Sequence, residues 1–130
     1  MARGPAPADR TLDGVDLVKL VQGKGQGRPH GAIFWRSGHY RTILADDWKL
    51  QVAERPKKTW LFDLNADPTE QRDLSAERPD KVRELSAILA EHEQQMSPPI
   101  WPALIEGPIA IDHALNVAPQ DRDEYVYWAN

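Results

Sequence analysis

The sequence predicts an α+β fold: a four-stranded antiparallel sheet covered on one face by a C-terminal helix, with an extended tail. Four short runs rich in aromatic and β-branched residues follow one another, and the turn residues between them are typical of antiparallel neighbours. A longer segment from residue 79 then places apolar side chains at i, i+3 and i+4, as in a helix that covers a sheet. The 130 residues are enough for one domain with its own core.

Residues 1–27 are expected to form a linker and a short helix that lead into the main domain. Apolar side chains recur at near-helical spacing around Val18, behind an acidic first turn that begins near Thr11 or Asp13. Gly23 is placed to end this helix, and a glycine-punctuated loop follows it.

The four strands are expected to form a meander. Alternation is clearest in the third run, where Trp48, Leu50 and Val52 point to one face, so this face should be buried. Three of the strands carry one tryptophan each, and we expect Trp35, Trp48 and Trp60 to pack between sheet and helix. The four runs are residues 32–35, 40–44, 48–52 and 59–64.

The connections between these strands carry turn residues. Residues 37–38 and 46–47 predict tight reversals. Residues 55–58, Arg-Pro-Lys-Lys, predict a longer basic loop that places Lys57 and Lys58 at an exposed tip.

The covering helix is expected over residues 79–96, with Pro79 at its first position, where a missing N–H costs nothing. The main domain then spans residues 28–97. The tail, residues 98–130, is too apolar to remain free in water and should pack on the domain, and residues 124–128 favour a short strand. The apolar stripe of the helix consists of Val82, Leu85, Ile88, Leu89, His92 and Met96.

Charge is unevenly distributed along the chain, although the net charge is only −4. Residues 28–60 hold seven Arg or Lys against three acids, whereas residues 61–130 hold five against fourteen. The basic stretch can attract an anion such as a sulfated substrate, or it can be a solvated sheet face beside an acidic helix. An acidic chain with no recognised nucleic-acid motif argues against nucleic-acid binding.

Composition excludes several further classes. There is no Cys, hence no disulfide, thiolate metal site or cysteine nucleophile. No apolar run reaches the roughly 20 residues of a membrane span, and the first residues lack the apolar middle of a signal peptide. These observations do not identify a compartment.

Three separated segments resemble the sulfatase family and occur in the family's order. Residues 60–75, W-L-F-D-L-N-A-D-P-T-E-Q-R-D-L-S, resemble "L-Y/F-D-L-x-x-D-P-x-E-x-x-N-L", a run near the C-terminal end of sulfatases. Residues 34–50 resemble "F-W-R-x-G-x-Y-R-A-V-R-x-G-D-W-K-L" of arylsulfatase-like members, and residues 6–23 resemble "L-D-G-V-D-L-x-x-L-L-x-G". Asp73 stands where the family has Asn, and Asp46 where it has Gly.

The resemblance implies the C-terminal subdomain of an arylsulfatase-like sulfuric ester hydrolase. Its parent enzyme would use calcium and a formylglycine made from Cys or Ser in a C-x-P-x-R or S-x-P-x-R motif, and neither motif occurs here. We therefore expect no cofactor, catalytic residue or metal ligand in this chain, and no activity from it alone. The implied partners are an N-terminal catalytic domain upstream of these residues and, through it, a sulfated small molecule or sugar; the parent could be periplasmic or cytoplasmic.

Candidate substrate-rim residues are His30, Arg36 and His39, which flank the first strand within the basic stretch. A cation or imidazole there could hydrogen-bond the part of the substrate that carries the sulfate. Alternatively, Arg36 and Arg41 are surface cations that pair with carboxylates, each pair worth under about 1 kcal/mol.

Other polar residues are expected to have structural roles. His92 lies on the apolar stripe, which favours a core histidine with one hydrogen bond over a ligand. The acids between residues 63 and 73 favour turns and caps over an EF-hand, because Pro68 stands where a ligand loop must stay flexible and the EF-hand glycine and closing glutamate are missing.

Two alternatives remain open. The chain could be a free-standing anion-binding or interaction module that keeps the subdomain fold, with a closed polar surface. A docking subdomain should instead expose a large apolar patch. The parent could also be a related phosphatase or phosphonate hydrolase, because those enzymes share the fold.

Overall fold

The computed structural model divides the chain into two compact units, Met1–Gly31 and Ala32–Asn130, which are considered separately. The first unit contains the short helix α1 (Val18–Val21), and Gly23 follows it with a φ of 69°. Thr11 and Asp13, where this helix was expected to begin, lie outside the described residues. The structure describes residues 9, 14–15, 17–24, 27–98, 100–101, 104–111, 116–118, 120 and 123–129.

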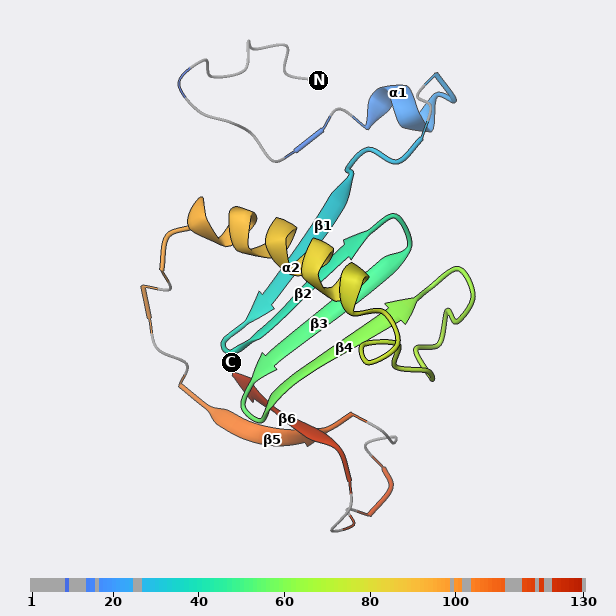
Figure 1. Ribbon diagram of the computed structural model, residues 1–130. Coiled ribbons are helices and arrows are strands. Elements are labelled where there is room, and N and C mark those ends of the chain that lie inside the picture. The colour runs from blue at the N-terminus through green and yellow to red at the C-terminus, as the bar shows by residue number, and fades with distance from the viewer. Residues whose placement is uncertain are drawn as a thin grey trace. The chain divides into compact units, whose positions relative to one another are not determined.

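The second unit is built on a four-stranded antiparallel sheet with strand order β1-β2-β3-β4 (Figure 1). The α+β class and this sheet are therefore confirmed, and each strand lies within two residues of its expected bounds at both ends. The strands are β1 (Ala32–Ser37), β2 (Tyr40–Ala45), β3 (Trp48–Glu54) and β4 (Lys57–Asp63).

All three connections in this sheet are two residues long. Asp46 and Asp47 have φ values of 49° and 67°, the positive angles that a type I′ hairpin turn requires. The expected longer loop at residues 55–58 is wrong, because β3 and β4 stay paired up to Glu54 and Lys57. These two opposite charges face each other and extend the ladder. Lys57 and Lys58 are exposed, but they belong to β4.

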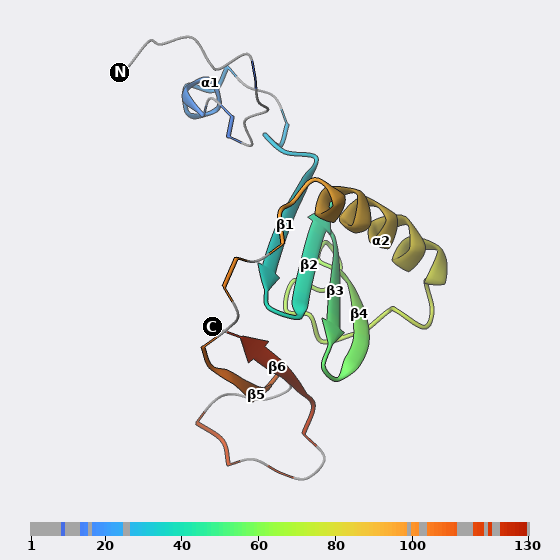
Figure 2. The same cartoon turned by 90° about the vertical axis from the view of Figure 1, so that its left-hand side faces the viewer.

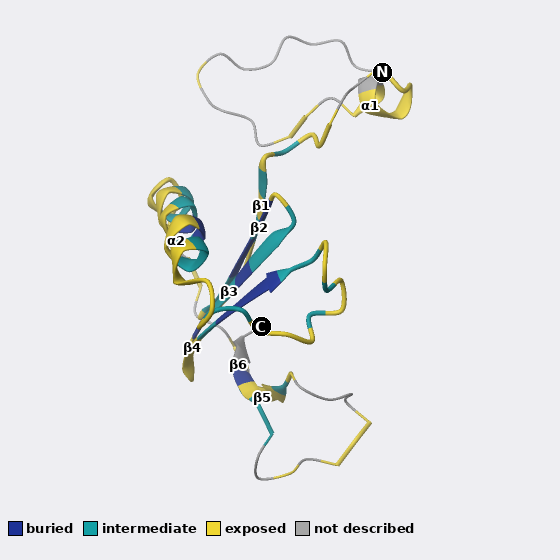
Figure 3. Ribbon diagram, turned by 45° about the vertical axis from the view of Figure 1, so that its right-hand side comes forward, coloured by how far each residue is buried: buried dark blue, intermediate teal, exposed yellow. Residues whose placement is uncertain are grey.

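The helix α2 (Pro79–Gln94) lies over one face of the sheet (Figures 1 and 2). Buried residues gather in the strands and on the side of α2 that faces them (Figure 3). Burying each large apolar side chain contributes about 1.5–3 kcal/mol. The cluster consists of Leu85 and Leu89 from α2 and Ile43, Ala45, Leu50 and Leu61 from the sheet.

A separate two-stranded antiparallel sheet pairs β5 (Glu106–Ala110) with β6 (Tyr125–Ala129). Val126 of β6 is 1% exposed and packs with Ala53, Trp60 and Phe62 on the sheet face opposite α2, hereafter the back face. Two expectations stay predictions: that α2 covers the whole of one sheet face, and that residues 98–130 wrap the edge of the domain.

The three strand tryptophans do not share one environment, so the expectation that all pack against the helix is wrong for two of them. Trp48 lies on the α2 face, where the Arg78 guanidinium stands 5.3 Å from its ring centre. Trp60 is 3% exposed on the back face. Trp35 occupies the same cross-strand row as Trp60 and is 50% exposed. Successive side chains of a strand point to opposite faces of the sheet, so the position of each tryptophan in its strand decides which face it lies on.

Candidate functional site

The turn after β4, within residues 60–75, is held by its own carboxylates. Asp63 accepts hydrogen bonds from the N–H groups of residues 65 and 66. Asp73 Oδ1 accepts from the N–H of Leu61 at 3.0 Å and of Ser75 at 2.8 Å. Asp67 Oδ2 accepts from the N–H of Arg72 at 2.8 Å, and this bond above all lowers the pKa of Asp67.

Glu70 joins this turn to the back face. Its backbone φ is 58°, and its Oε1 lies 2.7 Å from Nζ of Lys49 on β3. Gln51, two residues further along β3, donates from Nε2 to Glu70 Oε2 at 2.8 Å. The acids of the turn therefore have structural partners, as expected. Two of the three family-like segments, residues 34–50 and 60–75, also contact each other through these groups.

A polar pocket of about 490 Å³ opens on the back face. Glu124 Oε1 accepts from Trp60 Nε1 at 3.0 Å and forms an ion pair with Lys58, while Glu70 and Asp73 make the contacts above. The carboxylates that line this pocket therefore hold the turn after β4 and the segment before β6 against the sheet. Burial raises the pKa of the Tyr40 phenol at its edge. The lining residues are Tyr40, Gln51, Trp60, Phe62, Thr69, Glu70, Gln71, Asp73, Ile111 and Glu124.

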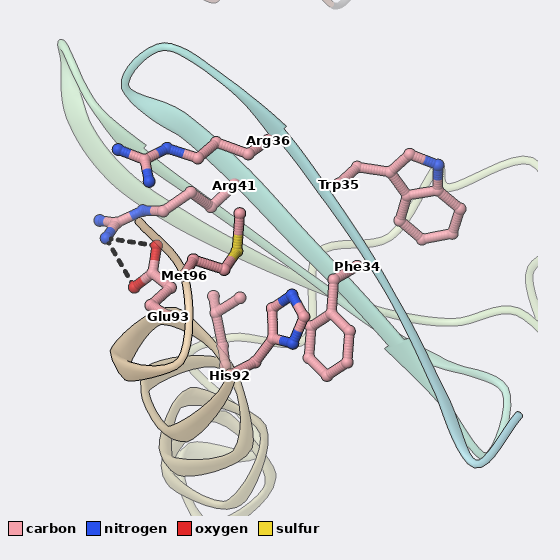
Figure 4. Close-up of a pocket in the computed structure, with 8 residues that line it drawn as sticks. Phe34, Trp35, Arg36, Arg41, His92, Glu93 and Met96 are labelled. Atoms are coloured by element: carbon pink, nitrogen blue, oxygen red, sulfur yellow. Dashed lines mark hydrogen bonds and ion pairs between the residues drawn. The ribbon is translucent and has the colours of Figure 1, made fainter. Parts of the chain in front are cut away.

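A smaller pocket of about 50 Å³ lies between β1, β2 and the C-terminal end of α2 (Figure 4). Its apolar wall contains Phe34 and His92, whose rings stack with centres 3.8 Å apart and planes 6° from parallel. Trp35 points away from it, to the other side of β1 (Figure 4). The lining residues are Phe34, Trp35, Arg36, Arg41, Leu89, His92, Glu93 and Met96.

Two arginines stand at the mouth of this small pocket. Arg41 donates from Nη1 to both oxygens of Glu93, at 3.1 and 3.0 Å, and from Nη2 to Glu54 at 2.7 Å. Its Nε is buried and has no hydrogen-bond partner. Arg36 lies directly opposite Arg41 in the β1–β2 ladder. In the described part of the chain, the Arg36 side chain makes no hydrogen bond or ion pair. Pairing with carboxylates is thus confirmed for Arg41 alone.

The three candidate rim residues fall in different places. Arg36 lies on β1, and His39 lies in the turn that follows it, where His39 Nδ1 is 3.5 Å from Glu54 Oε2. His30 belongs to the first unit and is considered apart from them. Substrate contact by any of these residues stays a prediction.

His92 is a site residue that the sequence did not identify. It was expected to make one hydrogen bond in the core, but it is half-buried and stacks on Phe34 instead. No hydrogen bond of its ring is found among the described residues. Its position on the apolar stripe correctly indicated the face, and the partner ring on β1 could not be read from helix spacing.

Large apolar side chains are exposed on the second unit. Ile33 and Trp35, two residues apart on the back face of β1, are 44% and 50% exposed. Single exposed apolar residues are ordinary on soluble proteins, whereas a large contiguous apolar patch marks an interaction surface. The other exposed large hydrophobics described here are Met96, Ile100, Trp101, Leu104, Ile105, Ile109, Ile111, Val117 and Tyr125.

Comparison with protein families gives a negative finding. No family model matches the chain. The sulfatase resemblance therefore depends on the three motif segments alone. Within the described ranges, no group of three or more His, Asp or Glu could hold a metal ion, and no helix is long and apolar enough to cross a membrane.

Proposed function

We propose that this chain is the C-terminal subdomain of an arylsulfatase-like sulfuric ester hydrolase, which docks on an N-terminal catalytic domain and completes the rim of its substrate cleft. The supporting observation is that two family-like segments act together. Lys49 of the first binds Glu70 of the second, and Asp73 of the second holds the Leu61 N–H at its beginning. Lys49, Glu70 and Leu61, which match the family motifs, and Asp73, which departs from them, thus form one interlocked strand and turn.

The docking surface in this proposal is the back face of β1. Ile33 and Trp35 are exposed there, while the α2 face of the sheet carries the main core. Because each side chain is already about half buried, covering its exposed remainder against a partner would contribute about half of the roughly 1.5–3 kcal/mol of full burial. The proposal also includes a helix α2 that closes its whole face and a tail that wraps the domain edge.

The cofactors implied by the resemblance belong to the proposed catalytic domain. The described residues offer no metal-binding cluster, and the sequence has no C-x-P-x-R or S-x-P-x-R motif. These residues do not fit a calcium or formylglycine site, so no catalytic step is assigned to them. A phosphatase or phosphonate hydrolase parent would give this subdomain the same role.

The test is the reading frame upstream of Met1. An open frame that encodes C-x-P-x-R or S-x-P-x-R would support the proposal, and its whole product should hydrolyse nitrophenyl sulfate with calcium. The 130-residue chain alone should not hydrolyse it. Calcium-dependent hydrolysis by this chain alone would contradict the proposal, and a natural transcript that starts at Met1 would favour the free-standing module.

A further inference from the structure

The two edge strands of the four-stranded sheet, β1 and β4, differ in how their outer sides are used (Figure 1). On β4, the Leu61 N–H donates to Asp73 at 3.0 Å, and the Leu61 carbonyl accepts from the N–H of Leu74 at 2.8 Å. The Asp63 carbonyl accepts from the N–H of Asp67 at 2.7 Å. The turn after β4 therefore covers this edge and protects it from pairing with another strand.

The outer side of β1 is open. The hydrogen bond from the Glu54 N–H to the His39 carbonyl belongs to the β2–β3 ladder, and hydrogen-bonded pairs alternate along antiparallel strands. Followed from β3 through β2 to β1, this alternation leaves the N–H and C=O groups of Ala32, Phe34 and Arg36 pointing away from the sheet. In the part of the chain that the structure describes, no backbone hydrogen bond reaches these groups from outside the sheet.

β1 also lacks the features that usually protect an exposed edge. It is a regular strand of 6 residues without Lys, Pro or a bulge, and its pairing with β2 is unbroken. Its back face carries Ile33 and Trp35, which are 44% and 50% exposed. By contrast, β4 begins with the exposed residues Lys57 and Lys58. The edge at β1 is therefore suited to pairing with another strand.

A second copy of β1 fits this edge. When two copies run antiparallel with Phe34 opposite Phe34, residues 32–36 of both strands pair along their whole length. Trp35 of each copy then lies directly opposite Ile33 of the other, and such pairs of aromatic and β-branched side chains stabilise sheets. The two Arg36 side chains lie at opposite ends of the paired segment, so these like charges do not face each other.

The charges of the β1–β2 hairpin match the same arrangement. Arg36 of one copy lies opposite Ala32 of the other, and Ala32 pairs with Ala45, which is followed by Asp46. Two strand spacings, about 10 Å, separate Arg36 from the strand that ends beside Asp46, a gap that the two side chains can span. Both side chains are exposed, and neither has an ion pair within the described ranges. Each copy thus brings a cation to an acid of the other.

We propose that two copies of this chain pair antiparallel through β1, so that their two sheets join into one. Because the turn after β4 covers the opposite edge, the assembly stops at a symmetric dimer. The inference goes beyond the proposed function, because it rests on the edge of the sheet and holds for the chain alone. Edge pairing leaves the back face of both β1 strands open to a catalytic domain.

Sedimentation equilibrium of the whole chain tests the dimer. One pair of short strands is smaller than a standard interface, so we expect a dissociation constant between about 10 μM and 1 mM. Arg36→Pro removes an outward N–H at a position where an edge strand tolerates proline, and it should abolish the dimer. Arg36→Gln removes the same charge but keeps the N–H, and should weaken the dimer about three- to tenfold. Arg83→Gln, at an exposed position on α2, should change nothing.

Disulfide formation tests the register, because the chain has no cysteine of its own. Residues 32 and 36 of different copies should have Cα atoms about 5.5 Å apart, a distance that a disulfide can bridge. A mixture of Ala32→Cys and Arg36→Cys chains should therefore form a linked dimer under mild oxidation. Either variant alone should not, because its two cysteines lie about four residues apart along the paired strands.

Circular dichroism of each variant verifies folding. A wild-type chain that stays monomeric, oligomers larger than a dimer, or a dimer that a folded Arg36→Pro variant leaves unchanged would overturn the inference. Crosslinks that form in the single-variant samples and not in the mixture would overturn it as well. If Arg36→Pro does not fold, the crosslinked mixture decides the question.

Discussion

The Glu70 carboxylate lies 2.7 Å from the Lys49 ammonium group and joins the turn after β4 to the middle of β3. Both side chains are less than one-third exposed, at 30% and 23%, so water screens this pair less than a surface pair. Glu70 holds a positive φ to reach this position, which a residue with a side chain adopts only when contacts favour it.

Glu70→Gln should lower the free energy of unfolding by about 1–2 kcal/mol, because Lys49 then keeps its charge without a counter-charge. Urea unfolding measures the change. The matched control is Glu77→Gln, which breaks the exposed pair with Arg72 and should cost under about 0.5 kcal/mol. Equal losses in the two variants would mean that the Lys49 contact contributes no more than a surface pair.

Asp73 stands where the sulfatase motif that this segment resembles usually has Asn, and either residue can fill its role in this structure. Its Oδ1 accepts two backbone N–H groups, from Leu61 and Ser75, and an Asn carbonyl can accept the same two. Asp73→Asn should therefore leave stability nearly unchanged. Asp73→Ala removes the acceptor and should cost about 1–3 kcal/mol in urea unfolding. If both variants lose the same amount, the charge matters and not the acceptor.

Part of this site could be predicted from sequence because the forces are local. Pro68 and the acids around it predict a turn, and their bonds run mostly within five residues. The alternation of apolar and polar residues in residues 48–52 likewise predicted that Leu50 is buried, and it lies in the core. The Lys49–Glu70 pair joins residues 21 apart in sequence. That these two residues pair could not be predicted before the register of β3 and β4 was known.

The small pocket was harder to predict for the same reason. Arg41 and Glu93 are 52 residues apart, and the stack of Phe34 on His92 depends on where α2 crosses β1. The second sheet was half-predicted. Residues 124–128 favoured a strand, but its partner β5 contains Gly107 and Pro108, which are unfavourable in strands. Pairing with β6 overrides that local preference.

Asp67 should give the protein an acid-dependent stability. The backbone N–H of Arg72 is the main cause that lowers its pKa in the folded state. Its contribution is therefore complete above the unfolded-state pKa, near pH 4, and is lost as pH falls through the folded-state value. Asp67→Asn should flatten the fall in melting temperature below about pH 4. The pKa of Asp80 is also lowered, mainly by a hydrogen bond from Arg78, so Asp80 contributes stability over the same pH range. The double variant Asp67→Asn/Asp80→Asn should therefore show a still smaller fall in melting temperature as the pH is lowered. If the melting temperature of Asp67→Asn falls with pH in the same way as that of the wild type, Asp67 does not cause the acid-dependent stability.

Val126 tests whether the C-terminal hairpin stabilises the sheet. It is 1% exposed and packs on Trp60, so Val126→Ser should cost about 1–3 kcal/mol and alter the tryptophan fluorescence. Val117→Ser, at a residue that is 47% exposed, is the control and should cost under about 0.5 kcal/mol. Equal effects would show that the hairpin adds no stability through Val126.

Trp35 tests the proposed docking surface. Its side chain is half exposed on the back face of β1, beside Ile33, and it adds little to the core. Trp35→Ser should therefore change the free energy of unfolding by less than about 1 kcal/mol while reducing self-association at high concentration, because it removes apolar area that two copies can bury. Sedimentation equilibrium measures the association, and urea unfolding measures the stability. Lys57→Ser, at an exposed residue of β4, controls for a general change in surface composition. A wild-type chain that stays monomeric at all concentrations would favour the free-standing module. A Trp35→Ser variant that unfolds as easily as a core variant would show that Trp35 belongs to the fold and not to a docking surface.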